Sequence, residues 1–521
     1  MIFRSRFPDV EIPEVGLAEF VIEKAETYGD RPALIDGPTG RTVTYAGLAR
    51  TVRALAAGLA QRGFGKGDVL AVYSPNLPEY AVVLHAVAML GGVTTTVNPL
   101  YTARELTEQV SDAGARLLIT VPPLLERALE ASRQAGVKDV VVFGEAKEAS
   151  SFASLLQSGE RVPPVSIAPR TDVVVMPYSS GTTGLPKGVM LTHYNLVANI
   201  CQTEALFPME VERVIAVLPF YHIYGLTVLL NISLHRGDTV VTMPRFDLEQ
   251  FLQLMQQHGV TRAFVVPPIV LALAKHPLVE KYNLGSLRSI NSGAAPLGEN
   301  IEQACENRLH CFVAQGYGLT ETSPVVSTTP IDPAVRRAGS AGLLIPNTEC
   351  RVVDPASSAE LEANQQGEVC VRGPQVMKGY LNQPAATAAM LEPDGWLHTG
   401  DIGMVDQDGY LFIVDRLKEL IKYKAFQVAP AELESLLLKH PAVADAAVIP
   451  HPDPEAGEVP KAFVVMKGQA SPEELMAFVN GQVAPFKKIR LLEVVDQIPK
   501  SPAGKILRRT LIERERSHAG A

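Results

Sequence analysis

Apolar residues recur along the first part of the chain in two alternating patterns. One pattern has helical spacing, with an apolar residue every three or four positions at Leu48, Val52, Leu55 and Leu59. Gly63 follows this run at the place where a helix would end. The other pattern is a short continuous apolar run, first seen at 69–72, which is typical of a buried strand, and residues 78–90 return to helical spacing.

This alternation of strand-like and helix-like segments continues through further apolar runs at 93–97, 117–119 and 140–143. Strands that alternate with helices are typical of parallel sheets whose faces are covered by helices. The sequence therefore predicts an α/β fold, with a large N-terminal domain of parallel-type sheets flanked by helices. We find no internal repeat and no low-complexity tract.

A change in character after residue 414 predicts a domain boundary. The strand-like run 409–413 ends there, and the chain then becomes basic, with Lys418, Lys422 and Lys424. The remainder contains one helix-like segment and two strand-like runs, at 430–439, near 446–448 and near 462–465. We predict a large N-terminal domain (1–414) and a small mobile α+β domain (415–521).

A loop of small residues follows the apolar run 173–176, and it is the strongest chemical signal in the chain. Its glycines let backbone N–H groups approach an anion, its hydroxyls add donors, and its lysine adds charge. The loop therefore predicts a polyphosphate site, although it does not have the Walker spacing of glycines and lysine. A hydrophilic surface turn is the alternative. The predicted phosphate contacts are Ser179, Ser180, Gly181, Thr182, Thr183, Gly184 and Lys187.

The bulk composition excludes several classes of function. Among 521 residues, 47 basic and 56 acidic side chains give a net charge of −9, which argues against a nucleic-acid partner. The five cysteines form no Cys-x-x-Cys pair and are odd in number, which favours reduced thiols and a cytoplasmic location. No run of about 18 apolar residues occurs, so we expect no membrane span. Small anionic ligands stay possible, because local lysines matter more than the total charge.

Four further segments accompany the loop in a fixed order, at 315–321, 399–401, 415–430 and 499–509. With 179–188, they resemble the motifs of the adenylate-forming superfamily, which contains acyl-CoA synthetases, adenylation domains and luciferases. The resemblance spans nearly the whole chain and is greatest to 4-coumarate:CoA ligases. It implies an ATP-dependent, AMP-forming carboxylate:CoA ligase that forms an acyl-adenylate and then a thioester. ATP, Mg²⁺ and CoA are the implied ligands, and 4-coumarate or cinnamate is the implied type of acid.

The resemblance also implies roles for individual residues. Glu321 would hold magnesium, since Mg²⁺ on ATP needs few protein carboxylates. Lys505, in a loop rich in proline and glycine, would be the catalytic lysine of adenylate formation. The implied nucleotide contacts are Ala294, Gly316, Tyr317, Thr320, Asp401, Arg416 and Lys418.

His222 resembles the histidine that lines the carboxylate site of the family, and Tyr224 the tyrosine that borders an aromatic acyl group. A structural histidine and a tyrosine packed in the core are the alternatives. The remaining residues of the implied acyl pocket are Gly293, Gly318, Pro324 and Val325.

For the thioester step, the resemblance implies that the small domain rotates about a hinge, bringing Lys422 and Gln427 to the site in place of the final lysine. The implied CoA contacts are Arg245, Lys424 and Ala425. Related enzymes usually have glycine at the position of Ala425, and the added methyl group would narrow the pantetheine tunnel. Ala425 therefore keeps open a ligase that passes the acyl group to an amine, and the same motifs would also serve a medium-chain fatty acyl-CoA synthetase. We expect a monomer or a homodimer.

Overall fold

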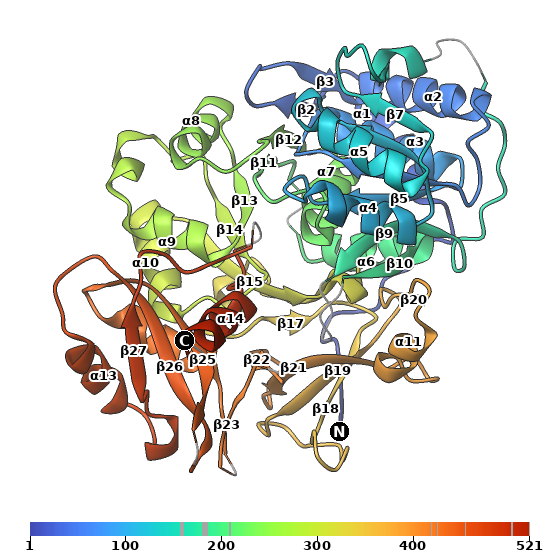
Figure 1. Ribbon diagram of the computed structural model, residues 1–521. Coiled ribbons are helices and arrows are strands. Elements are labelled where there is room, and N and C mark those ends of the chain that lie inside the picture. The colour runs from blue at the N-terminus through green and yellow to red at the C-terminus, as the bar shows by residue number, and fades with distance from the viewer. Residues whose placement is uncertain are drawn as a thin grey trace.

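The computed structural model describes residues 1–156, 161–179, 186–207, 210–417, 419–424, 426–453, 455–501 and 504–519 (Figure 1). The fold is α/β, as predicted: sheets and helices form a large N-terminal part, and a smaller α+β part follows it. In Figure 1 the smaller part, coloured orange to red, lies beside α9 and α10 of the larger one. Within the described ranges, no helix has both the length and the apolar character needed to cross a membrane.

The first sheet contains the predicted strands of the N-terminal region. Its central strands run parallel, and their residues are buried because helices pack on both sides; all five residues of β5 are buried. β10 returns antiparallel to β9, so the two strands flank residues 180–185. The strand order is β20 (Gly379–Tyr380), β10 (Lys187–Thr192), β9 (Val173–Ser179), β5 (Val93–Val97), β4 (Val69–Tyr73), β6 (Ala115–Thr120), β7 (Asp139–Val142) and β8 (Ser150–Ser151).

The second sheet provides one wall of the cavity described below. Its strands β11 to β15 are parallel, and β16 turns back antiparallel to β15. Leu70 of the first sheet and Val241 of the second belong to one continuous buried core. The order is β17 (Leu343–Leu344), β16 (Val325–Thr328), β15 (Phe312–Gly318), β14 (Ser289–Ser292), β13 (Arg262–Val265), β11 (Arg213–Ala216), β12 (Thr239–Thr242), β2 (Pro32–Asp36) and β3 (Thr42–Thr44).

Local sequence explains where several helices begin and end. The predicted helix at 48–59 lies within α2, and Gly63 follows its end with φ +74°. Thr192 caps the N-terminus of α6, where its side chain and that of Asn195 form a reciprocal capping box. The helices of the large part are α1 (Lys24–Tyr28), α2 (Tyr45–Gln61), α3 (Pro78–Met89), α4 (Ala103–Asp112), α5 (Leu125–Ala135), α6 (His193–Glu204), α7 (Ser233–Arg236), α8 (Leu248–His258), α9 (Pro267–Lys275), α10 (Glu299–Leu309), α11 (Pro384–Met390) and the π-helix η4 (Tyr224–Ile232).

A third, antiparallel sheet joins the large part to the small one. Its last two strands pair so that Asp401 on β21 lies opposite Arg416 on β22. Two residues that are fifteen positions apart in sequence therefore become direct cross-strand neighbours. The order is β1 (Ile2–Arg4), β18 (Glu349–Val353), β19 (Gly367–Arg372), β21 (Leu397–Val405) and β22 (Leu411–Arg416).

The small part has its own sheet and its own buried core, which includes Leu433, Val448 and Val464. The predicted boundary at 414/415 stays a prediction, and the structure begins the small sheet at Ile421. Its strands are β24 (Phe426–Val428), β23 (Ile421–Tyr423), β26 (Gly457–Met466) and β25 (Val443–Asp453), with β27 (Leu491–Val494) parallel to β26. Its helices are α12 (Pro430–Lys439), α13 (Pro472–Asn480) and α14 (Arg508–Ala519).

Candidate active site

A cavity of about 1120 Å³ lies where the carboxyl ends of the central strands meet the small domain. This is the edge at which open α/β sheets bind ligands. The cavity brings together many of the residues that the sequence singled out, from segments far apart along the chain. Those that line it are Ser179, His222, Tyr224, Gly293, Ala294, Gly316, Tyr317, Gly318, Thr320, Glu321, Pro324, Val325, Arg416 and Lys505.

The glycine-rich loop is described only at its two ends. β9 ends at Ser179 and β10 begins at Lys187. Lys187 is buried, and its Nζ lies 5.0 Å from the ring centroid of Tyr380. The predicted contacts Ser180, Gly181, Thr182, Thr183 and Gly184 lie outside the described residues.

Glu321 is held at the cavity wall by two hydroxyl groups. Ser179 Oγ donates to Glu321 Oε1 at 2.9 Å, and the Tyr380 hydroxyl donates to the same oxygen at 2.8 Å. Both bonds fix the carboxylate and neither uses Oε2, which receives no hydrogen bond from any described residue. A positioned carboxylate with one unused oxygen fits a hard cation such as Mg²⁺.

Asp401 forms the centre of a second polar group. The Tyr317 hydroxyl donates to Asp401 Oδ2 at 2.7 Å, and Arg416 Nε lies 3.2 Å from Oδ1. Burial raises the pKa of Asp401, and the charges of Arg416 and Lys505 and the hydrogen bond from Tyr317 oppose this rise. Burial lowers the pKa of Arg416, but Asp401, Glu419, Tyr317 and Glu321 together outweigh burial, so the pKa of this guanidinium is raised. The pair can therefore present a charged carboxylate and a cation side by side.

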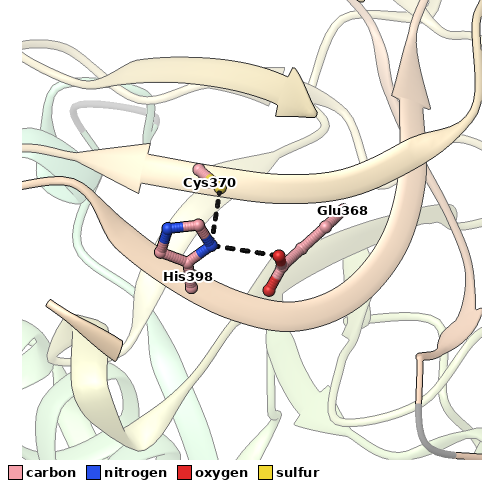
Figure 2. Close-up of side chains that lie close together, drawn as sticks. All are labelled: Glu368, Cys370 and His398. Carbon is pink, nitrogen blue, oxygen red and sulfur yellow. Dashed lines mark hydrogen bonds and ion pairs between the residues drawn. The ribbon is translucent and has the colours of Figure 1, made fainter. Parts of the chain in front are cut away.

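Figure 2 shows the support of the turn before Asp401, where Glu368, Cys370 and His398 lie close together. His398 Nδ1 is 3.0 Å from Glu368 Oε2 and 3.5 Å from Cys370 Sγ. His398 Nε2 is 2.7 Å from Glu392 Oε1, and the backbone N–H of Gly400 donates to Glu368 Oε1 at 3.0 Å. The three groups are close enough to share a metal ion, but both ring nitrogens already contact carboxylates. We interpret the group as a hydrogen-bonded brace for the Asp401 strand.

The acyl side of the cavity is bounded by aromatic side chains and small residues. Tyr224 donates from its hydroxyl to the Asn291 carbonyl oxygen at 3.3 Å. A Cβ on Gly293 would lie 2.9 Å from the Tyr224 ring, so glycine is what allows this approach. Burial lowers the pKa of His222 to about 4, so the imidazole at this wall is neutral at pH 7.

Lys505 reaches the same cavity from the small domain. Its loop packs on the large domain, since a Cβ built on Gly504 would lie 3.0 Å from Val266 Cγ2. Gly504 also has a φ of +75°, which favours glycine. The Lys505 N–H donates to Ser501 Oγ at 3.2 Å, which closes the loop. Lys505 lines the cavity, and its positive charge opposes the rise in the pKa of Asp401. The structure therefore has the final lysine, rather than the β23–β24 hairpin, at the cavity.

Several predicted residues are not brought to the cavity. Lys422, Lys424 and Arg245 are exposed and do not line it. Gln427 lies opposite Lys422 in the β23–β24 hairpin. Lys418 and Ala425 lie outside the described residues, so the expected narrowing by Ala425 stays a prediction.

The residues of the cavity wall that sequence reasoning missed include Tyr380, Thr203, Phe207 and Phe264. Phe264 is on β13, where period-two alternation along an identified strand would have shown that it shares a face with Arg262. Tyr380 belongs to no motif and contacts Glu321 only because β20 pairs with β10. No sequence signal pointed to it.

The chain is similar to known proteins along nearly its whole length. Residues 21–381 match the model of the AMP-binding enzyme family, and residues 432–505 match the AMP-binding enzyme C-terminal domain. The chain is 43% identical to 4-coumarate–CoA ligase 1 of Petroselinum crispum, over 98% of this chain and 96% of that protein. It resembles ATP-bound MatB from Rhodopseudomonas palustris at 29% identity and a TM-score of 0.87, covering 96% and 99% of the two chains. The amide bond synthetase McbA from Marinactinospora thermotolerans is similar at 28% identity and a TM-score of 0.86, covering 95% and 99%.

Proposed function

The chain belongs to the AMP-binding enzyme family, and we propose that it is an ATP-dependent, AMP-forming carboxylate:CoA ligase for aryl-propenoic acids such as 4-coumarate or cinnamate. One observation carries this proposal. A single cavity is lined by Lys505, Glu321 and Arg416, which pairs with the buried Asp401, and the same cavity includes a pocket walled by aromatic rings. The similarity to 4-coumarate–CoA ligases over nearly the full length supports the same reaction.

In the first half-reaction, the carboxylate oxygen of the acid attacks the α-phosphorus of ATP. A bond forms between that oxygen and phosphorus, the bond to the pyrophosphate oxygen breaks, and acyl-AMP and pyrophosphate result. Because an ionised acid needs no general base, positioning and charge neutralisation supply the catalysis. We assign neutralisation to Lys505 and Lys187, and we assign the ribose hydroxyls to Asp401, whose carboxylate is oriented by Tyr317.

Magnesium fits the group around Glu321. Of the two carboxylate oxygens, Oε1 is fixed by Ser179 and Tyr380, which leaves Oε2 as the ligand atom. When bound there, Mg²⁺ would neutralise phosphate charge. The tyrosine and the serine determine the direction in which the carboxylate points.

In the second half-reaction, the CoA sulfur attacks the acyl carbonyl carbon, the bond to the AMP oxygen breaks, and the thiol proton is released. Lys422 and Lys424 are exposed on the small domain and do not line the cavity, and Gln427 pairs with Lys422 in the β23–β24 hairpin. We propose that rotation of this domain removes Lys505 and brings the β23–β24 hairpin to the site. The cytoplasmic location and the monomeric or dimeric state expected from the sequence stay predictions.

The pocket favours a flat acid over a flexible chain. Tyr224 and Phe264 meet edge to face with centroids 6.5 Å apart, and Phe207 lies 5.9 Å from Phe264. Flat rings are well suited to pack against such walls. An amine acceptor is the second candidate, favoured by the similarity to an amide bond synthetase.

The test measures pyrophosphate release and thioester formation with 4-coumarate, cinnamate and octanoate, each with and without CoA. We expect CoA-dependent turnover of the aromatic acids. Preference for octanoate would point to a fatty acyl-CoA synthetase, and pyrophosphate release without thioester would point to an amine acceptor.

A lysine pair on one loop gives a matched control for the catalytic assignment. Lys505→Ala should lower adenylate formation by about 10²–10³-fold, which is typical for loss of one positioned charge stabiliser. Thioester formation from supplied acyl-adenylate should be nearly unchanged. Lys500→Ala should leave both steps within about threefold, because Lys500 pairs with Asp445 at 2.6 Å and does not line the cavity. Full adenylate formation by Lys505→Ala would refute the assignment.

A further inference from the structure

A buried arginine without a polar partner lies directly behind the acyl pocket. Arg262 is 1% exposed, yet its Nε, Nη1 and Nη2 make no hydrogen bond within the described part of the chain. A guanidinium carries five N–H donors, and buried donors are almost always satisfied. The nearby Arg236 shows the usual situation: its Nε lies 3.2 Å from Asp238 Oδ2. The donors of Arg262 therefore require an acceptor that the folded chain does not supply.

The location of Arg262 connects it to the substrate. It lies on β13 two residues before Phe264, so the two side chains share one face of the sheet. Its guanidinium carbon lies 4.0 Å from the ring centroid of Phe207 and 5.3 Å from that of Phe264. Both rings line the cavity, and Phe207 is only half-buried. Arg262 thus lies one side chain behind the floor of the acyl pocket, covered by the ring of the half-buried Phe207.

The charge of Arg262 is not neutralised by contact. Burial lowers its pKa to about 10, which leaves it cationic at neutral pH. Glu212 is the acid that acts on it most strongly, but Arg288 Nη2 already donates to Glu212 Oε2 at 2.7 Å. Within the described residues, no carboxylate lies within ion-pair distance of Arg262. An oxygen with available lone pairs at the far end of the acid would be attracted to this charge.

Two further unsatisfied groups belong to the same part of the pocket wall. Thr203 Oγ1 and Asn291 Oδ1 are buried, have no hydrogen-bond partner among the described residues, and belong to side chains that line the cavity. Thr203 lies in the last turn of α6, four residues before Phe207, and Asn291 is the cross-strand partner of Phe264. The polar groups next to the Phe207 and Phe264 rings thus include the N–H donors of Arg262, an acceptor on Asn291 and a hydroxyl on Thr203. None of these groups has a hydrogen-bond partner among the described residues.

From this arrangement we propose that Arg262 is a specificity-determining residue that recognises a hydrogen-bond-accepting oxygen on the ring of the aryl acid, opposite its carboxyl-bearing chain. This inference rests on the proposed function and refines its substrate class to 4-oxygenated aryl-propenoic acids. Recognition occurs when Phe207 turns aside and the ring oxygen accepts an N–H from the guanidinium. Asn291 Oδ1 accepts in addition the proton of a 4-hydroxyl group.

The test compares four acids that differ only at the 4-position: cinnamate, 4-methylcinnamate, 4-coumarate and 4-methoxycinnamate. The methyl and hydroxyl groups are similar in size, so their comparison isolates the oxygen. The methoxy group accepts but cannot donate, so it separates Arg262 from Asn291. Pyrophosphate release gives kcat/KM for each acid. For the wild type we expect 4-coumarate to exceed 4-methylcinnamate by about 10–100-fold, as for a hydrogen bond to a charged group.

Two variants at this position, together with thermal unfolding, distinguish recognition from packing. Arg262→Met keeps length and apolar contact, and it should reduce the preference for the oxygenated acids to below about threefold, mainly through KM. Arg262→Lys should restore part of that preference. Because Arg262→Met also removes an unpaired buried charge, its melting temperature should be unchanged or higher. Arg213→Met is the control, because Arg213 is exposed and bonds the His258 carbonyl oxygen.

The outcomes separate the inference from the proposed function. An unchanged preference in Arg262→Met, with a lower melting temperature, would mean that the arginine only packs against the two rings, and it would overturn the inference alone. A wild-type enzyme that prefers 4-methylcinnamate to 4-coumarate would also overturn the inference alone. Absence of adenylate formation with all four acids would overturn the proposed function, and the inference with it.

Discussion

Tyr317→Phe should lower kcat/KM for ATP by changing the ionisation of Asp401. The substitution removes one hydroxyl, which donates to the buried Asp401 carboxylate at 2.7 Å, and leaves the ring in place. Burial already raises the pKa of Asp401, and this hydrogen bond is one of the interactions that oppose the rise. Without it, the pKa rises further, and a smaller fraction of Asp401 is ionised at neutral pH.

The size of the effect follows from the bond that is lost. A hydrogen bond to a charged group contributes about 1.5–3 kcal/mol, so its loss should raise the pKa of Asp401 and lower kcat/KM for ATP by about 10–100-fold at acid pH. Protonation removes an acceptor for the ribose hydroxyls. The acid limb of kcat/KM for ATP should therefore move to higher pH.

The assay is pyrophosphate release at varied ATP between about pH 5.5 and 9, with a saturating aryl acid. Tyr410→Phe is the matched control, because the Tyr410 hydroxyl donates to the Val335 carbonyl oxygen at 2.5 Å and does not line the cavity. Its pH profile should match that of the wild type. An acid limb that stays in place for Tyr317→Phe would show that the hydroxyl does not control Asp401. A decrease in kcat/KM for ATP that is equal at every pH would mean that Tyr317 acts only through packing.

Three further predictions concern stability and pocket shape. Arg508→Met should destabilise the small domain by about 3 kcal/mol in chemical denaturation, because it leaves buried Glu434, held by two bonds of 2.8 Å, without its cation; unchanged stability would contradict this. Gly293→Ala should lower kcat/KM for aryl acids about tenfold while sparing propionate, since its Cβ would lie 2.9 Å from Tyr224; equal losses for both acids would refute the pocket assignment. Burial lowers the pKa of His398, but its carboxylate partners outweigh burial and raise it, so its stabilising contribution is present below about pH 6.5 and is lost as pH rises through the folded-state pKa. Thermal unfolding of wild type and His398→Asn from pH 5.5 to 8.5 should show a difference that shrinks with pH, and a constant difference would refute it.

Much of the fold could be predicted because its signals are local. The spacing of Leu48 to Leu59 identified α2, since helical periodicity depends only on backbone geometry over a few residues. The glycine-rich loop was found for the same reason, since its composition is a local property. The roles of the individual site residues stay predictions, and the domain boundary likewise.

Contacts between distant segments could not be predicted from local patterns. Tyr380 reaches Glu321 because a two-residue strand pairs with β10, and neither residue carries a sign of the other in sequence. Arg262 looks like an ordinary charged residue in the sequence, and only packing between β13 and the rings of Phe207 and Phe264 shows that it is buried and unpaired.

By itself, the sequence determined the α/β class, the order of the motifs and the side chains that each motif supplies, because composition and periodicity are fixed along the chain. The tertiary structure decided which of these groups meet. Strand register placed Asp401 opposite Arg416, and packing of the small domain placed Lys505 rather than Lys422 at the cavity. The physical reason is that side-chain ionisation, burial and hydrogen bonding depend on neighbours in space, and register and domain packing choose those neighbours.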